Sequence, residues 1–522
     1  MNIATINVPK HITIAEIMYR NARKYPNKEA VVFKDRRLNY KEIDDLSNQV
    51  ANAIIGLGIN KGDHVALMMN NSEMFVAVYF GIMKAGGVVI PLNTRFVKRE
   101  VEFILDNSDA KLIIGGEEFE SILWGIKLNV SNLQNVICVG KELPGAYELN
   151  ELMNNTSQER PQVMVEEDDL CSIIYTSGTT GSPRGAVFDH RRVVYNVSII
   201  GVINHRFTHY TRHLIMMPLF HSAPLHLYML GTMFVGGTVV IMPAYDPKMF
   251  LELVQAEKIT HFFGPALVYL TCSKQFDMSK YDLSSVELFL MGGSPASAED
   301  QALIIDQFKL RGRFQQVYGL TEAGPTGTAL FPEDIERKPA SLGVNGAIGA
   351  ELVIVDEHLN KIEEPGVVGE IAVLVESAMR EYYKDPEKTA NTLKNGWILT
   401  GDLAKYDEDG YVYFVDRLKD MIISGGQNVY SKEIEDVLMQ HPAVSEVAVI
   451  GVPHPEWGES VKAVITLLPN RTATADEIIK FCRDKLARFK RPRYVQIVDV
   501  LPHNPAGKIT KPEVRKLYGQ PV

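Results

Sequence analysis

The sequence predicts an α/β protein, with a large N-terminal domain of βαβ subdomains plus a small β subdomain, followed by an α+β C-terminal domain. Three observations support this fold class. Apolar strand-type runs alternate with amphipathic helix-type runs up to about residue 320, which is typical of βαβ units. After about residue 340, short β-type runs are separated by Gly, Pro and Asp turns. From Lys432 onward a compact mixture of helices and strands follows, so we expect domains at 1–416 and 417–522.

The elements of the N-terminal part follow from hydrophobic periodicity. Ile14, Ile17 and Met18 recur at helical spacing, whereas Ala30 to Phe33 is a short apolar run of strand type. We expect helices at 12–25, 40–57, 73–85, 98–105, from about 190, at 225–234, 247–257 and from about 298, and strands at 30–33, 64–69, 88–91, 111–114, 170–174, 213–217, 238–242, 261–263, 286–291 and 314–318. Such units form a mainly parallel sheet, which binds ligands outside the carboxyl ends of its strands.

The remaining elements are shorter, and residues 115–165 show no clear periodicity. In the β subdomain we expect strands at 351–355, 368–374 and 411–415. In the C-terminal domain we expect helices at 432–440 and 474–487 and strands at 446–450, 460–467 and 494–498. The boundary between these two parts is expected between Asp416 and Asp420.

Composition and charge limit the function classes. The chain has 522 residues, of which 46% are hydrophobic and 23% charged, as in a soluble globular protein. A net charge of −10 argues against bulk attraction to nucleic acid. The four cysteines form no CxxC pair, so neither a zinc site nor a disulfide framework is indicated, and we expect a cytoplasmic protein.

Two stretches bear on membrane contact. The apolar stretch 225–242 contains His226 and lies between Pro224 and Pro243, so we interpret it as a buried helix followed by a buried strand. Basic residues gather at 483–493. Three interpretations of this cluster are contact with an anionic cofactor tail, contact with a membrane surface, and plain exposure to solvent. We therefore expect at most peripheral membrane contact.

The stretch from Thr176 to Gly185, Thr-Ser-Gly-Thr-Thr-Gly-Ser-Pro-Arg-Gly, follows a predicted strand. Its glycines allow close approach of the backbone to a ligand, and its hydroxyls, its N–H groups and Arg184 all suit phosphate oxygens. It lacks the Gly-Lys-Ser/Thr ending of a Walker loop. A flexible linker is the alternative, but a linker needs neither a preceding strand nor a single arginine. We predict a polyphosphate-binding loop.

Three further motifs carry polar groups next to glycine. Tyr318-Gly319-Leu320-Thr321-Glu322 combines a ring that can stack, a hydroxyl and a carboxylate of the kind that Mg²⁺ prefers, although Thr321 alone would suit a helix N-cap. Thr400-Gly401-Asp402 offers a carboxylate that can hold two ribose hydroxyls, although such an Asp is more often a turn residue. Pro505-Ala506-Gly507-Lys508 presents a lysine that, taken alone, would be a surface charge.

Together and in this order, the motifs resemble the adenylate-forming (AMP-binding) superfamily, in particular medium- and long-chain fatty acid–CoA ligases. The resemblance rests on Thr-Ser-Gly-Thr-Thr-Gly with Pro-x-Gly, Tyr-Gly-x-Thr-Glu, Thr-Gly-Asp, Arg-x-Lys-Asp at 417–420 and the terminal Gly-Lys, and it covers nearly the whole chain. It implies an acid–thiol ligase that uses ATP, Mg²⁺ and CoA. A carboxylate attacks the α-phosphate of ATP, pyrophosphate leaves, the mobile C-terminal domain rotates, and a thiol displaces AMP.

The resemblance also assigns roles to matching positions. The implied catalytic residues are Lys508, which bridges the carboxylate and α-phosphate, Thr321 on the α-phosphate, Glu322, His221 near the acyl carbonyl, and Lys419 at the hinge. The implied nucleotide, metal and CoA contacts are Thr176, Ser177, Gly178, Thr179, Thr180, Gly181, Arg184 and Gly185 for the phosphates, Glu322 with Thr176 for Mg²⁺, Gly292, Gly293, Ser294, Tyr318 and Gly319 for adenine and acyl group, Asp402 and Arg417 for ribose, and Gly426 for pantetheine.

Two positions depart from the family pattern. Arg184 stands where the family usually has Lys, which keeps the charge and adds donors. Val317 stands where the family often has Gly before the tyrosine, and it narrows the space beside the adenine or the acyl chain.

The acid and the acceptor are less defined. Candidate acyl-pocket residues are the apolar Phe220, Leu225, Phe262, Phe263 and Met291, although each also suits ordinary core packing. We favour a medium- or long-chain fatty acid, with an aryl acid of benzoate or cinnamate type as the alternative. Because no carrier segment follows the Lys508 loop, we expect free CoA as acceptor, with a separate carrier protein as the alternative. A homodimer is an expectation from the family alone.

Overall fold

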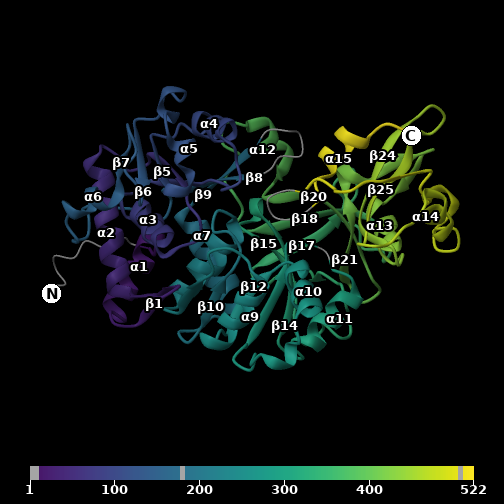
Figure 1. Cartoon of the computed structure of the whole chain (residues 1–522), viewed down its shortest axis with the longest axis horizontal. Coiled ribbons are helices and arrows are strands. Elements are labelled where there is room, and N and C mark those ends of the chain that lie inside the picture. The colour runs from purple at the N-terminus through teal and green to yellow at the C-terminus, as the bar shows by residue number, and fades with distance from the viewer. Residues whose placement is uncertain (1–10, 177–182, 295, 504–508, 522) are drawn as a thin grey trace. The chain divides into compact units, whose positions relative to one another are not determined.

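The computed structural model describes residues 11–176, 183–294, 296–503 and 509–521 (Figure 1). The chain divides into two compact units, Met1–Leu352 with Val373–Ile398, and Val353–Ala372 with Leu399–Val522. The first unit is the larger and contains mixed α/β layers, and the second is smaller, which confirms the predicted fold class. The predicted domain boundary at 416/417 stays a prediction.

The first sheet of the larger unit holds seven strands, and its central pairs are parallel. In sheet order they are β7 (Tyr147–Glu148), β6 (Asn135–Val139), β5 (Leu112–Gly116), β3 (His64–Met68), β4 (Val88–Pro91), β8 (Leu170–Thr176) and β9 (Arg184–Asp189). The last pair, β8 and β9, is antiparallel. The predicted polyphosphate loop therefore joins the two strands of a hairpin, and the strand β9 lies between this loop and the next helix.

The second sheet of this unit holds eight strands. In sheet order they are β15 (Thr326–Leu330), β14 (Phe314–Leu320), β13 (Leu288–Gly292), β12 (His261–Gly264), β10 (Arg212–Ile215), β11 (Thr238–Ile241), β1 (Glu29–Phe33) and β2 (Arg36–Asn39). The pairs from β14 to β1 are parallel, as predicted, and only the two edge strands β15 and β2 run antiparallel to their neighbours.

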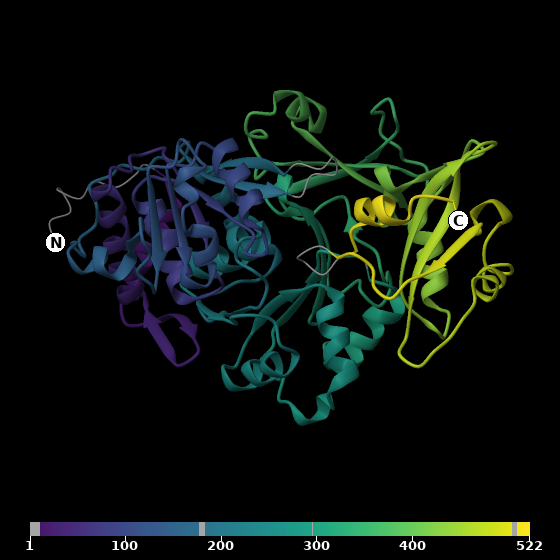
Figure 2. The ribbon, with the colours of Figure 1, turned by 45° about the horizontal axis from the view of Figure 1, so that its top comes forward.

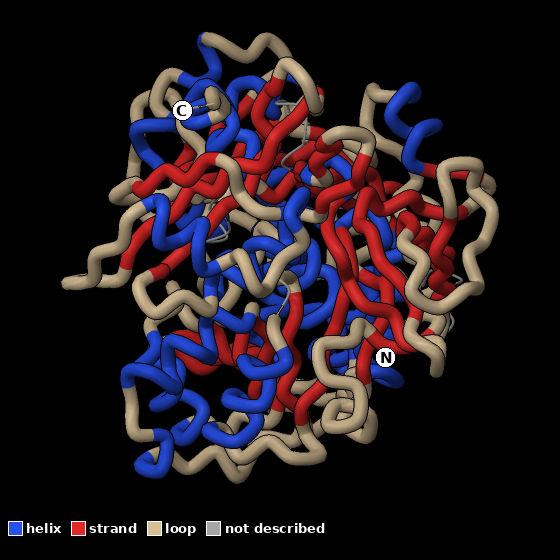
Figure 3. Tube along the Cα trace, turned by 90° about the vertical axis from the view of Figure 1, so that its right-hand side faces the viewer, coloured by secondary structure: helices blue, strands red, loops and turns tan. Residues whose placement is uncertain are grey.

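Helices fill the space beside these sheets (Figures 1 and 3). Their bounds are α1 (Ile14–Lys24), α2 (Tyr40–Gly56), α3 (Glu73–Lys84), α4 (Lys98–Asn107), α5 (Glu120–Leu123), α6 (Leu149–Asn154), α7 (His190–Asn196), α8 (Leu230–Phe234), α9 (Pro247–Ala256), α10 (Ala266–Gln275), α11 (Ala298–Gln307) and α12 (Pro386–Thr392). One apolar core contains Val31 of β1, Leu67 of β3 and Phe80 of α3, so α3 shares a core with both sheets. The helix α3 is buried on all its faces, which explains its continuous apolar sequence.

Short turns and π-type turns complete the larger unit. They are the 3-10 turns η2 (Glu117–Phe119), η3 (Ile126–Leu128), η6 (Met278–Lys280) and η7 (Thr321–Ala323), the π segments η4 (Val197–Asn204) and η5 (Ala223–Met229), and the short strands β16 (Gly343–Val344) and β19 (Leu393–Lys394). The predicted helix 225–234 is thus a π segment followed by α8. Such π segments occur frequently at functional sites.

The smaller unit begins with strands of the β subdomain. These are β17 (Ala350–Val355), β18 (Gly369–Val375), β20 (Trp397–Tyr406) and β21 (Tyr411–Arg417), followed by the 3-10 turn η8 (Leu418–Asp420). The strands β20 and β21 form an antiparallel hairpin, and β20 lies at none of the strand positions predicted from the sequence. Asp402 and Arg417 are opposite each other at its open end.

The C-terminal part of this unit is a second sheet with helices on both faces (Figure 2). Its elements are β22 (Ile422–Ser424), β23 (Gln427–Val429), α13 (Ser431–Met439), β24 (Val444–His454), β25 (Gly458–Leu467), α14 (Ala475–Phe481), η9 (Arg488–Lys490), β26 (Tyr494–Ile497) and α15 (Lys511–Tyr518). Val447 and Val449 pack against α13 and α14, and Ala448 and Ile450 pack on the other face with Val514 of α15. This alternation follows the two-residue period of β24. The helix α14 ends at Phe481, six residues before the predicted end.

No helix in the described ranges is both long and apolar enough to cross a bilayer. The stretch 225–242 forms parts of η5 and α8 and then the strand β11. All four cysteines are buried as free thiols.

Candidate functional site

The hairpin β8–β9 presents the predicted polyphosphate loop. Thr176, the last residue of β8, is directly opposite Arg184, the first residue of β9, so these two residues close the loop. The predicted phosphate contacts Ser177, Gly178, Thr179, Thr180 and Gly181 lie outside the described residues and stay predictions. The guanidinium Nε of Arg184 lies 3.4 Å from Oδ2 of Asp385, a residue that also caps the start of α12.

A segment that the sequence analysis did not single out runs along β9. The N–H groups of Arg380 and Tyr383 donate to the carbonyl oxygens of Val187 and Gly185, both at 2.8 Å. The N–H of Val187 donates in return to the carbonyl of Glu381 at 2.9 Å. These bonds fix the position of Tyr382. In the sequence, the only feature that marks Tyr382 is that it belongs to a pair of tyrosines shortly before the Asp that caps a helix.

Glu322 is the meeting point of three segments. Its Oε1 accepts a hydrogen bond of 2.7 Å from the hydroxyl of Tyr382 and one of 3.5 Å from the hydroxyl of Thr176. Burial and the neighbouring carboxylate raise the pKa of Tyr382, so this phenol remains a donor at any physiological pH. The structure thus brings together Thr176 and Glu322, the two residues proposed for Mg²⁺.

The donor set at Glu322 fits Mg²⁺. The ion prefers hard oxygen ligands and commonly takes one or two from protein and the rest from phosphates and water. Within the described ranges no hydrogen bond reaches the second carboxylate oxygen, Oε2. That oxygen can therefore serve a cation while Oε1 is held by the two hydroxyls. No group of three or more His, Cys, Asp or Glu side chains that could hold a metal ion occurs in the described part of the chain.

Thr321 connects the motif to the predicted acyl region. Its hydroxyl lies 2.9 Å from the hydroxyl of Ser222, the residue after His221. The ring of His221 lies beside that of Phe220, with 4.4 Å between their centroids. The predicted α-phosphate contact and the predicted acyl-carbonyl contact are therefore on neighbouring segments of one unit.

The end of β13 approaches β14 very closely. Gly292 is opposite Val317, and a Cβ atom at position 292 would lie 2.5 Å from the Val317 carbonyl oxygen. Only glycine fits at position 292 without a shift of the Val317 backbone. The side chain of Val317 lies on the Gly292 side, where the family often leaves space. Val317 is the second of the two departures from the family pattern noted in the sequence.

A narrow cavity between β10 and η5 includes one predicted acyl-pocket residue, Phe263, in its lining. It is lined by His213, Leu214, Ile215, Met216, Met217, Pro224, Tyr228 and Phe263, encloses about 150 Å³ and is too narrow for a water molecule. Phe263 stacks on Tyr228 with 4.5 Å between ring centroids. Phe262 instead packs against Phe250 and Phe289 in a separate aromatic cluster, so it does not line this cavity. Consecutive residues of a strand point to opposite faces, which explains the difference.

The smaller unit holds the predicted ribose contacts. The Nε of Arg417 lies 3.6 Å from Oδ1 of Asp402, and the N–H of Asp402 donates to the hydroxyl of Thr400. Partial desolvation and the nearby Arg417 lower the pKa of Lys419, which lies in η8. Gly426 occupies the turn between β22 and β23 with φ of 75°, a conformation that favours glycine. Lys508 lies outside the described residues.

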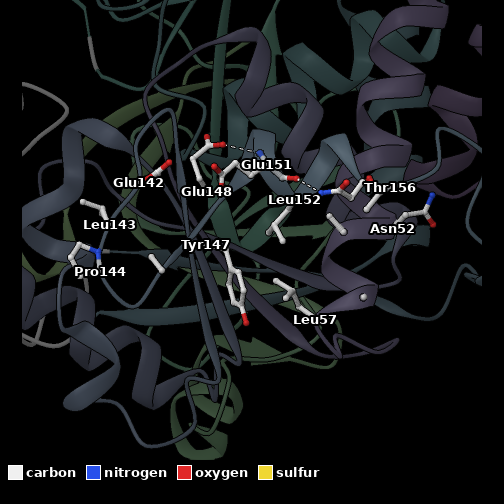
Figure 4. Close-up of a pocket in the computed structure, with 14 residues that line it drawn as sticks. Asn52, Leu57, Glu142, Leu143, Pro144, Tyr147, Glu148, Glu151, Leu152 and Thr156 are labelled. Atoms are coloured by element: carbon white, nitrogen blue, oxygen red, sulfur yellow. Dashed lines mark hydrogen bonds between the residues drawn. The ribbon is translucent and has the colours of Figure 1, made fainter.

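A second cavity of the larger unit contains none of these residues (Figure 4). It measures about 880 Å³ and is lined by parts of α2, β7 and α6 together with residues 142–146. Size alone therefore does not identify the candidate site, which we assign from the polar contacts of Glu322.

Comparison with known proteins finds two family models and several relatives that match the chain. The family model "AMP-binding enzyme" matches residues 18–383, and the model "AMP-binding enzyme C-terminal domain" matches residues 433–508. The chain is 36% identical over 490 residues to a long-chain-fatty-acid–CoA ligase, FadD13, of Mycobacterium tuberculosis, covering 94% of each chain. It is 35% identical over 501 residues to a feruloyl-CoA synthase of Amycolatopsis, covering 96% of this chain and 98% of the relative.

A solved structure shows the same fold. The crystal structure of the anthranilate CoA ligase AuaEII in complex with anthranoyl-AMP superposes with a TM-score of 0.89 at 28% identity and covers 98% of each chain. The match extends over both units of the present chain. With the two family models and these relatives spanning nearly its full length, the chain belongs to the family of adenylate-forming AMP-binding enzymes and is an acid–CoA ligase of the AMP-forming type.

Proposed function

We propose that the protein is an acyl-CoA synthetase that activates an apolar carboxylic acid with ATP and transfers the acyl group to CoA. The observation that carries this proposal is the pair of adjacent contacts Thr176–Glu322 and Ser222–Thr321. They join the phosphate loop, the metal carboxylate and the acyl segment within one unit. An acid and a triphosphate must meet at such a junction for adenylate formation.

In the first half-reaction, the carboxylate oxygen attacks the α-phosphorus and pyrophosphate leaves. The hydroxyl of Thr321 contacts the α-phosphate, and Arg184 with the loop that it closes holds the leaving phosphates. Glu322 and Thr176 would hold Mg²⁺, which supplies charge neutralisation between the two anions. The residues Gly292, Gly293, Ser294, Tyr318 and Gly319 would frame the adenine and the acyl group.

The smaller unit supplies the remaining proposed roles. Asp402 and Arg417 would hold the ribose, and Lys508 would bridge the carboxylate and α-phosphate oxygens. Lys419 would act as the hinge residue of a mobile domain 417–522, and Gly426 would border the path of pantetheine in the thioester-forming state. In the second half-reaction the thiol sulfur attacks the acyl carbon and AMP leaves.

The acid of this proposal is a medium- or long-chain fatty acid, in keeping with the relative named a long-chain-fatty-acid–CoA ligase. A second candidate, an aryl acid, is favoured by the stack of Phe263 on Tyr228, which suits a flat ring, and by the relatives named for ferulate and anthranilate. A cytoplasmic location and a homodimer remain predictions.

The test is ATP-dependent pyrophosphate release by the purified chain with Mg²⁺, CoA and a panel of alkyl, aryl and amino acids, with thioesters identified by mass spectrometry. We expect pyrophosphate and an acyl-CoA product with alkyl or aryl acids. Activity with amino acids alone would refute the proposal. Adenylate formation without transfer to CoA would instead support the loading of a carrier protein.

A further inference from the structure

The helix α4 ends in a Schellman turn whose left-handed residue is Asp109. The N–H of Asp109 donates to the carbonyl oxygen of Asp106 at 3.2 Å, and the N–H of Ala110 donates to that of Leu105 at 3.0 Å. The φ of Asp109 is 53°, in the region that glycine adopts more readily than any other residue. Glycine would therefore form this turn at least as well, so the turn itself does not explain the aspartate.

The carboxylate of Asp109 joins this helix end to the segment before α12 (Figure 1). Its Oδ2 accepts a hydrogen bond of 2.8 Å from the hydroxyl of Tyr383 and lies 2.7 Å from Nζ of Lys384. Desolvation acts to raise the pKa of Asp109, but the hydrogen bonds from Lys384 and Tyr383 outweigh it and hold that pKa below its ordinary value. The carboxylate is therefore charged at neutral pH.

The contact with Lys384 is better suited to positioning than to stability. Lys384 also has a positive φ, 56°, so its backbone is in a conformation that a lysine rarely adopts. The side chains of Lys384 and Asp109 are 47% and 40% exposed, and exposed ion pairs add little to the free energy of unfolding. The pair therefore mainly determines where residues 383–385 lie.

Asp385, the residue after Lys384, holds the guanidinium of Arg184. Its Oδ2 lies 3.4 Å from Nε of Arg184, while its Oδ1 accepts the N–H of Lys388 at 3.0 Å and caps α12. Asp109 is thus connected to Arg184 through two adjacent residues. A shift of residues 383–385 would move the carboxylate that fixes the direction of the guanidinium plane.

The same helix end contacts both strands that carry the predicted phosphate loop. Asn107, the last residue of α4, accepts a hydrogen bond of 2.6 Å from the hydroxyl of Tyr175 in β8. In β9, the register partner of Tyr175 is Gly185, whose carbonyl oxygen accepts the N–H of Tyr383 at 2.8 Å. Residues 107–109 therefore support the base of the loop on both strands.

We propose that Asp109 is a positioning residue for ATP binding, acting on Arg184 through Lys384 and Asp385. This proposal rests on the function proposed above, in which Arg184 holds the leaving phosphates of ATP. Without the carboxylate, residues 383–385 lose their anchor at α4, and Arg184 loses the fixed position of its partner. ATP then binds less tightly, because ordering Arg184 costs part of the binding free energy.

The test measures the Kd for ATP by isothermal titration calorimetry with Mg²⁺, in the absence of acid and CoA. We expect Asp109→Gly to raise this Kd by about threefold to tenfold, less than the loss of a whole charge-assisted hydrogen bond. Its Tm should stay within about 3 °C of wild type or rise, because glycine suits the left-handed position. A purely structural role would instead lower the Tm. Asp109→Asn keeps an acceptor oxygen for Tyr383 and Lys384, so its Kd should stay within about twofold of wild type.

Lys309→Gly is the matched control, because Lys309 takes the same place in the turn that ends α11. Its φ is 55°, its N–H donates to the carbonyl oxygen of Asp306 at 3.2 Å, and the N–H of Leu310 donates to that of Ile305 at 2.9 Å. The side chain of Lys309 is exposed. Lys309→Gly should keep the Kd for ATP without lowering the Tm. An equal rise of the Kd in both glycine variants would overturn the proposal.

A double-mutant cycle shows whether Asp109 acts through Arg184. Arg184→Gln alone should raise the Kd for ATP by about tenfold or more. Adding Asp109→Gly to Arg184→Gln should raise it by less than about twofold further, because the residue on which Asp109 acts is already gone. If the two effects multiply, Asp109 does not act through Arg184 and the proposal is wrong. Should Asp109→Gly melt below wild type, Lys384→Gln breaks the same ion pair from the other side and should give the same result in the cycle.

The outcomes also separate this proposal from the function on which it rests. If the wild-type chain does not bind ATP, the acyl-CoA synthetase function fails and the positioning role fails with it. If Arg184→Gln weakens ATP binding and Asp109→Gly does not, that function stands and the positioning role is wrong. If Arg184→Gln binds ATP as tightly as wild type, the phosphate role of Arg184 is wrong, and the positioning role of Asp109 with it.

Discussion

The hydroxyl of Tyr382 donates a hydrogen bond of 2.7 Å to Oε1 of Glu322, which also accepts the hydroxyl of Thr176. Tyr382 thereby holds the carboxylate proposed for Mg²⁺ in one orientation, although it is 60 residues away in the sequence. Tyr382 would affect the reaction only through Glu322, so we call it a positioning residue.

Tyr382→Phe removes this hydrogen bond and leaves the ring. A hydrogen bond to a charged group contributes about 1.5–3 kcal/mol, so we expect the Mg²⁺ concentration at half-maximal activity to rise about tenfold or more. The maximal rate at saturating Mg²⁺ should fall much less. Activity titrated with Mg²⁺ at fixed ATP checks this. Tyr383→Phe is the matched control, because its hydroxyl donates to Asp109 and does not contact Glu322. A fall in the maximal rate with an unchanged Mg²⁺ requirement would contradict the positioning role.

Arg184 can be tested at the position where the chain departs from its family. Arg184→Lys keeps the charge opposite Thr176, so we expect kcat/KM for ATP to change by less than about threefold, whereas Arg184→Gln should lower it about tenfold to a hundredfold. Pyrophosphate release at varied ATP concentrations measures both variants. Arg191→Gln, at an exposed position of α7, is the control. If Arg184→Gln matched wild type, the phosphate role would be wrong.

The alternation of strands and helices was readable from the sequence because each buried element repeats its apolar residues with its own period. The strand Leu170–Thr176 and the helix start at His190 follow that rule. The strand β9 was missed because Arg184 to Asp189 mixes charge, glycine and apolar residues, and its pairing with β8 depends on the loop between them. The π segment η5 was missed because its apolar sequence also fits an ordinary helix.

The site residues also divide into those that the sequence identifies and those that only the structure identifies. Thr176, Thr321 and Glu322 belong to short contiguous motifs, so they were recognisable in the linear sequence. Tyr382 and the hydrogen-bonding partner Ser222 were not, because their contacts depend on how distant segments pack. Phe262 was assigned to the acyl pocket because the two adjacent phenylalanines look alike in sequence, and only the strand's orientation separates them.

Asp402→Asn tests the ribose contact in the smaller unit. The substitution keeps the shape of the side chain but removes its charge opposite Arg417, 3.6 Å away. We expect the KM for ATP to rise about tenfold or more, because hydrogen bonds to a carboxylate are stronger than those to an amide. ATP–pyrophosphate exchange gives this KM. Glu408→Gln, at the exposed turn of the same hairpin, should leave it unchanged. An unchanged KM in Asp402→Asn would exclude the ribose role.

Because several histidines are buried, we expect acid to lower the free energy of unfolding. Burial lowers the pKa of His190 and His205 to about 4 and of His226 and His261 to about 3. In the unfolded chain these groups titrate near pH 6.5, so below that pH the unfolded state binds more protons. The stability from the neutral rings is complete above pH 6.5 and is lost as the pH falls toward 4. From pH 7 to 5.5 the four groups together remove about 5 kcal/mol of unfolding free energy.

Thermal melts between pH 8 and 5 check this acid sensitivity. We expect a nearly constant Tm above pH 7 and a steep fall below pH 6. His226→Phe should make that fall shallower, because one titrating group is removed, whereas exposed His358→Gln should leave it unchanged. A Tm that stays flat from pH 7 to 5 would show that the rings accept protons in the folded state without cost.

The separate roles of the two half-reactions can be tested at Lys508, which the family resemblance places between the carboxylate and the α-phosphate. Lys508→Ala should reduce adenylate formation from acid and ATP by about a hundredfold or more, because no other cation of that motif neutralises the attacking oxygen. Thioester formation from a supplied acyl-adenylate and CoA should remain within about threefold, since the phosphate is then only a leaving group. Lys516→Ala, at an exposed position of α15, is the control for both assays. Equal loss of both half-reactions would mean that Lys508 also supports the fold or the thioester step. The hypothesis that a mobile domain exchanges Lys508 for Gly426 at the reacting centre would then lose its main support.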